Sequence, residues 1–287
     1  MDNFKNVLRV ASYQGPIVEK EPETNLAKTF EVLKEAHNLK IDILCMPESY
    51  VHGYLDSEAE ARKYSVNLQS DTFKEWCHRF KAFSPTMILG LNELENDKIY
   101  NTAVVIENGE CIGKYRKAYT YPPYDYYSLG NEFPIFEKKG VKYSIIICLD
   151  SAFREPALIS ALKGARVLFC PMFNRVNKDV AIINYLNRKS HFISRAFDNH
   201  CWVVSSDITW GEESDMEVGQ GFSTVVDSEG QVVAQAQPFT EMMLSYDIPI
   251  AKLEQVKKWR LLGNPDLFSQ VEEQYAIAIQ NIEEKAT

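Results

Sequence analysis

The stretch VKYSIIICLDSAFREPALISALKGARVLFCP, residues 141–171, contains a strand, a helix and a second strand in one continuous run. The apolar segment VKYSIIIC (141–148) is typical of a buried strand. The segment PALISALKG (156–164) predicts a short helix that ends at Gly164, because glycine readily adopts the left-handed conformation of a helix C-terminus. The segment ARVLFCP predicts the next strand. This alternation of strand and helix indicates an α/β fold.

The first half of the chain shows the same order of elements. Apolar periodicity predicts alternating strands and helices, at residues 8–13, 24–38, 41–46 and 86–92, with a further helix that begins after Ser70. Two more strands, NTAVVIE and ECIGKYRK, follow and are joined at Asn108-Gly109. Both residues tolerate positive φ, so this dipeptide predicts a tight hairpin.

The second half continues in the same way. After residues 141–171 we expect a helix at 179–199, a strand CWVVSSD, a hairpin around residues 228–230 and a final strand MMLSYDI. The order βαβαβββ thus occurs twice. Each half would carry helices on one side of a mixed sheet and leave the other face apolar. If the two halves cover each other, the fold is a four-layer αββα sandwich with an internal pseudo-twofold repeat.

We expect this sandwich to form one domain over residues 1–265 and the remainder, 266–287, to be a C-terminal helical extension. Apolar residues at helical spacing mark one stripe of the extension. The stripe packs either on a neighbouring subunit or on its own domain, and the pattern favours neither. Its members are Leu267, Val271, Tyr275, Ile279 and Ile282.

Composition narrows the classes of partner. The 287 residues are 45% hydrophobic and 25% charged, with a formal net charge of −9, a globular balance. An acidic surface disfavours nucleic acid and anionic membranes, which bind basic faces. The N-terminal residues show no secretory pattern, and no apolar run reaches the roughly 20 residues that span a bilayer.

The six cysteines and five histidines show no metal-binding spacing. Several cysteines lie in apolar contexts and are typical of reduced core residues. We therefore expect a reducing, cytoplasmic location, with neither a metal nor a cofactor.

Three chemically useful residues follow predicted strands. Glu48 follows IDILCM, Lys117 ends ECIGKYRK, and Cys148 ends the three isoleucines. Side chains at the carboxyl ends of strands in α/β sheets lie where ligands bind. Each residue alone has an ordinary explanation, since charged residues at strand ends are usually solvated and Cys148 alone is more typical of a core position.

Together the three make a consistent catalytic set. A thiolate attacks an electrophilic carbon only after losing its proton, and a desolvated carboxylate such as that of Glu48 can accept it. The ammonium of Lys117 can stabilise an oxyanion, with the backbone N–H of Leu149 as a second donor. His52, in the loop YVHGY, is the rival base.

These residues resemble the nitrilase superfamily, the carbon–nitrogen hydrolases with a Glu-Lys-Cys triad. MPESYVHGY is similar to the glutamate motif, GKYRK to the lysine motif and CLDSAFREPA to the nucleophile motif. KGARVLFCP, RAFDNHCWVV, GFSTVVDSEGQVVA and YDI resemble further family segments in the expected order. The resemblance covers nearly the whole chain and implies an αββα sandwich that pairs into a homodimer. It also implies Glu48 as general base, Lys117 as oxyanion stabiliser and Cys148 as nucleophile through an acyl-enzyme.

Two departures from the family pattern concern the site. Many members carry a second glutamate after the lysine, and Asp125 is the matching residue here, with a structural role in its tyrosine-rich turn as the alternative. Members that hydrolyse N-carbamoyl amino acids hold a carboxylate with arginines just after the nucleophile, where this chain has Ser151 and Ala152. Such a substrate is therefore disfavoured, unless Arg154 or Arg175 reaches the site from another direction.

The sequence predicts an aromatic-lined pocket with walls from Tyr54, Tyr121 and Phe173. The leading hypothesis is a cysteine-dependent hydrolase of a small amide or carbamoyl amide, which releases ammonia through a thioester. The same triad would also serve a nitrilase or an acyltransferase. A non-catalytic scaffold that kept the fold is a third, less favoured alternative.

Overall fold

A computed structural model describes residues 6–210, 216–254 and 267–286. The described strands form two sheets. The first sheet contains β1 (Val7–Pro16), β2 (Ile43–Cys45), β3 (Thr86–Glu95), β4 (Lys98–Glu107), β5 (Glu110–Arg116), β9 (Val176–Asn177), β11 (Ile208–Trp210), β12 (Glu217–Gln220) and β15 (Met242–Pro249). The second contains β6 (Phe136–Lys138), β7 (Val141–Ile145), β8 (Val167–Pro171), β10 (Trp202–Ser206), β13 (Thr224–Val226) and β14 (Val232–Gln235).

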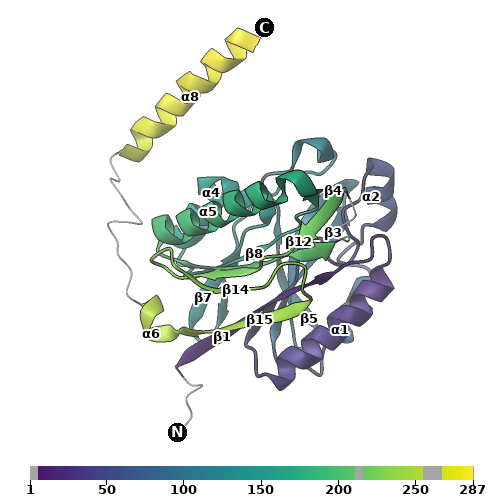
Figure 1. The fold of residues 1–287 in the computed structure, drawn as a ribbon. Helices are drawn as coiled ribbons and strands as arrows, with labels where there is room; N and C mark the ends of the chain where they lie inside the picture. Colours follow the sequence, from purple (N-terminus) through teal and green to yellow (C-terminus); the bar gives the residue numbers. More distant parts are fainter. Residues whose placement is uncertain (1–5, 211–215, 255–266, 287) are drawn as a thin grey trace.

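Helices lie outside the paired sheets, with α1 on one side of the strands and α4 and α5 on the other (Figure 1). The sandwich predicted from the sequence is confirmed. The α-helices are α1 (Pro22–Asn38), α2 (Glu58–Tyr64), α3 (Asp71–His78), α4 (Arg154–Leu162), α5 (Ala181–Asn199), α6 (Ile250–Leu253) and α8 (Leu267–Ala286). Short 3₁₀ helices are η1 (Pro122–Tyr124), η2 (Cys148–Ala152) and η3 (Lys178–Val180).

The central strands β1 and β2 of the first sheet are apolar on both faces, because each face has its own partner layer. In β1, Val10 belongs to the core shared with the second sheet, whereas Ala11 belongs to the core beneath α1 and α3. Ile43 and Leu44 of β2 divide in the same way. Successive side chains of a strand point to opposite faces, so a sheet buried on both sides reads as a continuous apolar run.

The final strand departs from a simple duplication. β15 does not join the sheet of the second half but pairs antiparallel with β1, from Val7 opposite Pro249 to Gln14 opposite Met242. The last described strand therefore returns to the first strand and joins the two halves. Periodicity identifies such a strand but not its partner, because the partner is set by tertiary contacts.

Local signals in the sequence agree with the structure at one hairpin and at two helix termini. Asn108 and Gly109 adopt φ values of 52° and 78° between β4 and β5, as the predicted hairpin requires. The Ser70 side chain accepts a hydrogen bond from the Phe73 backbone N–H at 3.2 Å and caps α3. Gly164, with φ of 108°, follows the end of α4.

The predicted extension is helix α8, which is drawn apart from the sandwich in Figure 1. Within the described side chains, Tyr275 and Ile279 of the predicted stripe are 60% and 52% exposed. The side chains of Leu267 and Ile282 lie outside the described residues. No helix in the described part of the chain is long and apolar enough to cross a membrane.

Gly90 of β3 explains how the segment that carries Glu48 fits against the sheet. A Cβ atom added to Gly90 would collide with the carbonyl oxygen of Pro47 and lie 2.5 Å from the backbone nitrogen of Ser49. Both atoms belong to the backbone and cannot rotate away. The absence of a side chain therefore permits the close approach of residues 47–49 to β3.

We expect Gly90→Ala to lower the free energy of unfolding by about 1–3 kcal/mol, the usual cost of forcing extra volume into a packed interior. Equilibrium unfolding in urea measures the change. A variant within about 0.5 kcal/mol of wild type, the range of neutral surface substitutions, would contradict this account of the contact.

Candidate active site

Glu48 lies just after β2 and is buried, with 1% of its surface exposed. Its Oε1 accepts hydrogen bonds from Lys117 Nζ at 2.6 Å, Asn101 Nδ2 at 2.7 Å and Tyr54 OH at 3.2 Å. Among the described residues, no group donates to Glu48 Oε2. One oxygen is thus fully occupied, and the other remains available as an acceptor.

Lys117 follows β5 and is also buried. Its backbone N–H donates to the Asn101 carbonyl at 2.9 Å, which holds the residue beside β4. Burial alone would lower the pKa of Lys117, but the adjacent Glu48 carboxylate outweighs burial and raises the pKa well above its usual value. Lys117 therefore remains a cation over the physiological range of pH.

Cys148 follows β7 and begins η2. Its φ is 45°, in the left-handed region that non-glycine residues seldom occupy. Such strained conformations persist only where surrounding contacts enforce them, and they are frequent at functional sites. The turn directs the chain out of the buried strand at the residue that bears the thiol.

Asp150 supplies the contacts that hold this turn. Its Oδ2 accepts hydrogen bonds from the Ile147 backbone N–H and from Tyr115 OH, both at 2.8 Å. Its Oδ1 accepts from the backbone N–H groups of Ala118 at 3.2 Å and Tyr119 at 2.9 Å. Asp150 therefore ties the cysteine turn to the segment immediately after Lys117.

The thiol of Cys148 is protonated in the resting site. Burial raises its pKa to about 11; the Glu48 carboxylate contributes to the rise, and the cations of Lys117 and Arg188 oppose it. Deprotonation therefore requires a nearby acceptor, and the carboxylate of Glu48 is the group with an oxygen left for that task.

A cavity of about 400 Å³ opens over Cys148 and Lys117. Its size is within the range of small-molecule sites. Every predicted pocket residue lines it, as does the predicted oxyanion donor, and these residues are Tyr54, Tyr121, Phe173 and Leu149. Tyr54 packs against Phe173 with ring centroids 5.1 Å apart, so an aromatic wall stands beside the thiol.

Two residues at the ion pair have roles that the sequence did not reveal. Tyr54 was predicted only as a wall, but its hydroxyl contacts both Glu48 and Lys117, the latter at 3.3 Å. Asn101, within β4, was not predicted at all and donates to Glu48. An asparagine inside an apolar strand is the signal that would have identified it, because buried amides need hydrogen-bond partners.

Other predicted residues lie elsewhere. Asp125 is exposed after η1 and is not among the described residues that line the cavity. His52 is buried away from the thiol, with burial lowering its pKa to about 3, and its Nδ1 accepts from the Asn92 backbone N–H. Arg154 is exposed at the start of α4. The structure thus brings together Glu48, Lys117 and Cys148 but not these three residues.

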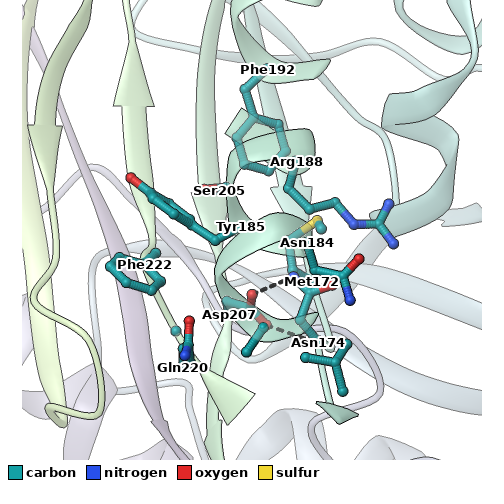
Figure 2. A pocket seen from close by; sticks show the side chains of 13 residues that line it. Met172, Asn174, Asn184, Tyr185, Arg188, Phe192, Ser205, Asp207, Gln220 and Phe222 are labelled. Atoms are coloured by element: carbon teal, nitrogen blue, oxygen red, sulfur yellow. Dashed lines mark hydrogen bonds between the residues drawn. The ribbon is translucent and has the colours of Figure 1, made fainter. Parts of the chain in front are cut away.

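The cavity also contains two arginines, Arg175 and Arg188. The sequence suggested the first as a candidate and missed the second. Arg188 lies in the middle of α5, where a cation is typical of a solvated helix face. Figure 2 shows its side chain extending away from Tyr185 and Phe222, which line a smaller adjoining pocket.

Comparison with known proteins identifies the family of this chain. The profile of the carbon–nitrogen hydrolase family matches residues 9–258. The 2-oxoglutaramate amidase of Bacillus subtilis is 30% identical over 79% of this chain and 85% of its own length. The omega-amidase NIT2-B of Xenopus laevis is 27% identical over 82% of this chain and 86% of its own. The chain belongs to the carbon–nitrogen hydrolase family, as the sequence predicted.

Solved structures extend the comparison to the fold. Nit3 of Saccharomyces cerevisiae, a member of branch 10 of the nitrilase superfamily, superposes with a TM-score of 0.76 at 24% identity and covers 88% of this chain and 94% of its own. A carbon–nitrogen hydrolase of Helicobacter pylori superposes with a TM-score of 0.80 at 20% identity and covers 94% of this chain and 99% of its own.

One sequence relative is much longer than this chain. The glutamine-dependent NAD(+) synthetase of Aquifex aeolicus is 28% identical over 84% of this chain, and the chain spans 41% of the length of that synthetase.

The raised pKa of Cys148 predicts how its reactivity depends on pH. Below a pKa of about 11, the thiolate fraction, and with it the rate of alkylation by iodoacetamide, rises about tenfold for each pH unit. Mass spectrometry of the Cys148 peptide, with Cys148→Ser to define the background from the exposed Cys111, measures this rate. A plateau reached at or below about pH 8, near the ordinary value for a free thiol, would contradict the burial argument.

Proposed function

We propose that this protein hydrolyses a small carboxylic or carbamoyl amide through a thioester on Cys148 and releases ammonia. The observation that carries the proposal is the buried ion pair of Glu48 and Lys117, 2.6 Å apart, whose Lys117 lines the same cavity as the thiol. The amidase names of two relatives support an amide in place of another electrophile.

Acylation begins when Glu48 Oε2 accepts the thiol proton and the sulfur attacks the amide carbon. The carbonyl π bond opens, and its electron pair forms an oxyanion. Lys117 Nζ and the backbone N–H of Leu149 donate to this oxygen. As the oxyanion collapses, the carbon–nitrogen bond breaks, and the proton held by Glu48 passes to the nitrogen, which leaves as ammonia.

Deacylation repeats these steps with water. Glu48 takes a proton from water, the hydroxide adds to the thioester carbon, and the carbon–sulfur bond breaks. The sulfur leaves as thiolate and recovers the proton from Glu48, so the enzyme returns to its resting state. Tyr54 and Asn101 donate to Oε1 of Glu48, the oxygen that does not take the proton, and are positioning residues in this scheme. A role for Asp125 in protonating the amide stays a prediction.

Ammonia release from a panel of aliphatic amides, carbamoyl compounds and nitriles tests the proposal. We expect Cys148→Ala to abolish turnover, by at least about 10³-fold, because the nucleophile is lost. Glu48→Gln should slow acylation by about 10²–10⁴-fold, the usual contribution of a general base. Glu110→Gln, at an exposed glutamate that begins β5, is the matched acidic control and should cost far less than Glu48→Gln.

Three outcomes would change the assignment. Full activity of Cys148→Ala would exclude the nucleophile proposed here. Hydrolysis of nitriles without hydrolysis of the matched amides would assign a nitrilase, and transfer of the acyl group to an added amine in preference to water would assign an acyltransferase. A Cys148 that alkylates no faster than the buried cysteines, together with no turnover on the panel, would favour the scaffold.

We further propose a homodimer formed through α5. Its outer face exposes large apolar side chains, more than a monomer surface usually leaves on one helix. The partner is a second copy of this chain, because relatives of this family are expected to pair, and α8 offers a further exposed apolar face. The exposed residues of α5 are Ile182, Ile183, Leu186 and Phe197.

Analytical ultracentrifugation tests the dimer. We expect wild type to sediment as a dimer and Leu186→Glu to sediment as a monomer, because a buried unpaired carboxylate disfavours association. Ile112→Glu, at a similarly exposed position of β5, is the control and should stay dimeric. A monomeric wild type would contradict the proposal.

We also propose a hydrolase domain over residues 1–265, a helical extension over residues 266–287 and a cytoplasmic location. The site residues and the match to the family profile lie within residues 1–265, which supports a helical extension after the hydrolase domain. The six free cysteines support a reducing, cytoplasmic location.

A further inference from the structure

The two arginines of the cavity differ in their surroundings. Arg175 is neutralised by three carboxylates: its guanidinium lies 2.8 Å from Glu19, 3.2 Å from Glu217 and 3.5 Å from Asp56. The guanidinium of Arg175 is therefore already paired with carboxylates of the protein. We do not expect it to bind an anionic ligand.

Arg188 has no such partner. None of the described residues forms a hydrogen bond or an ion pair with its guanidinium, although the side chain is half-buried. The acidic residue facing it across the small pocket is Asp207, whose Oδ1 accepts from the backbone N–H groups of Asn174 at 3.0 Å and Ile208 at 2.9 Å. Its Oδ2 accepts from the Asn174 side chain at 2.5 Å (Figure 2). Both oxygens of the Asp207 carboxylate thus have hydrogen-bond donors other than Arg188.

Arg188 shares the cavity with the thiol. Cys148 and Arg188 both line it, and each lies within the electrostatic field of the other. Lys117 is the other cation beside the thiol, and it is paired with Glu48. Asp207 and Glu48 act on the charge of Arg188 without forming an ion pair with it. In a chain with a net charge of −9, a half-buried guanidinium with no described carboxylate at ion-pair distance is unusual, because partly desolvated cations are normally paired.

We propose that Arg188 binds a carboxylate carried by the substrate, so that the preferred substrate is the monoamide of a short dicarboxylic acid. Arginine suits this task because its planar fork of N–H donors matches a carboxylate in a bidentate arrangement. The amide carbon would then lie at Cys148 while the distal carboxylate lies at Arg188. This inference rests on the proposed amide hydrolysis and names its substrate class.

An alternative role for Arg188 is purely electrostatic. Its charge lowers the pKa of the Cys148 thiol, and the loss of that effect would slow the reaction of every amide equally. Binding of a substrate carboxylate instead predicts a loss confined to charged amides. The ratio of activities on charged and neutral amides of equal length separates the two roles.

The test compares the monoamides of succinic, glutaric and adipic acids with butanamide, pentanamide and hexanamide. We expect wild type to favour the charged member of the best pair by at least about tenfold in kcat/KM, the value of one charged hydrogen bond. Arg188→Met should lower kcat/KM on that amide by about 10- to 150-fold, mainly through KM, and remove the preference. Arg188→Lys should restore part of it, whereas Arg154→Met, the matched control at an exposed arginine outside the cavity, should keep it.

Two results would overturn the inference while leaving amide hydrolysis intact: a wild type that favours neutral amides, or an Arg188→Met variant that slows both classes equally. If no amide is hydrolysed, the proposed function fails, and binding decides the role of Arg188 separately. In that case glutarate should protect Cys148 of wild type, but not of Arg188→Met, from iodoacetamide. Equal protection of the two proteins would exclude a carboxylate site at Arg188.

Discussion

The ion pair between Lys117 Nζ and Glu48 Oε1, at 2.6 Å and shielded from solvent on both sides, is the interaction on which the site depends. It joins the residues that follow β2 and β5 and places two opposite charges inside the fold. Neither charge would be stable there alone, and removing one partner of a buried pair typically costs about 3–5 kcal/mol. The pair also occupies Oε1 of Glu48, which leaves Oε2 for a proton in transit.

The cysteine turn is built around a second buried carboxylate. Asp150 accepts four hydrogen bonds and links the strained residue Cys148 to the segment that follows Lys117. Burial raises the pKa of Asp150 to about 6, so the acceptor weakens as pH falls below that value. These hydrogen bonds therefore fix the position of Cys148 relative to the segment that follows Lys117.

The sequence could identify those site residues that directly follow a predicted strand. Glu48, Lys117 and Cys148 each follow an apolar strand, so their spatial convergence followed from the rule that such ends share one edge of a sheet. Asn101 lies inside a strand and Arg188 in the middle of a helix, so the rule for strand ends did not identify them. Their positions beside Glu48 and in the cavity depend on which strands are neighbours and on how α5 packs, and these are tertiary facts.

The fold also has parts that the sequence predicted and parts that it did not. Apolar periodicity predicted most strands and helices, and the need to cover two apolar faces predicted the layers. The pairing of β15 with β1 was not predictable in this way, since an alternating strand pairs with whichever edge the finished sheet presents. The short strands β9, β11 and β12 were not predicted either, because two to four residues are too few to show an alternating apolar pattern.

Rapid quenching followed by intact-mass and peptide mass spectrometry tests the central claim most directly. Wild-type protein mixed with a hydrolysable amide should carry one acyl group, with the mass of the amide minus ammonia, on the peptide that contains Cys148. Glu48→Gln should accumulate this adduct more slowly. Turnover without any adduct on Cys148, or an adduct on another residue, would contradict covalent catalysis by this thiol.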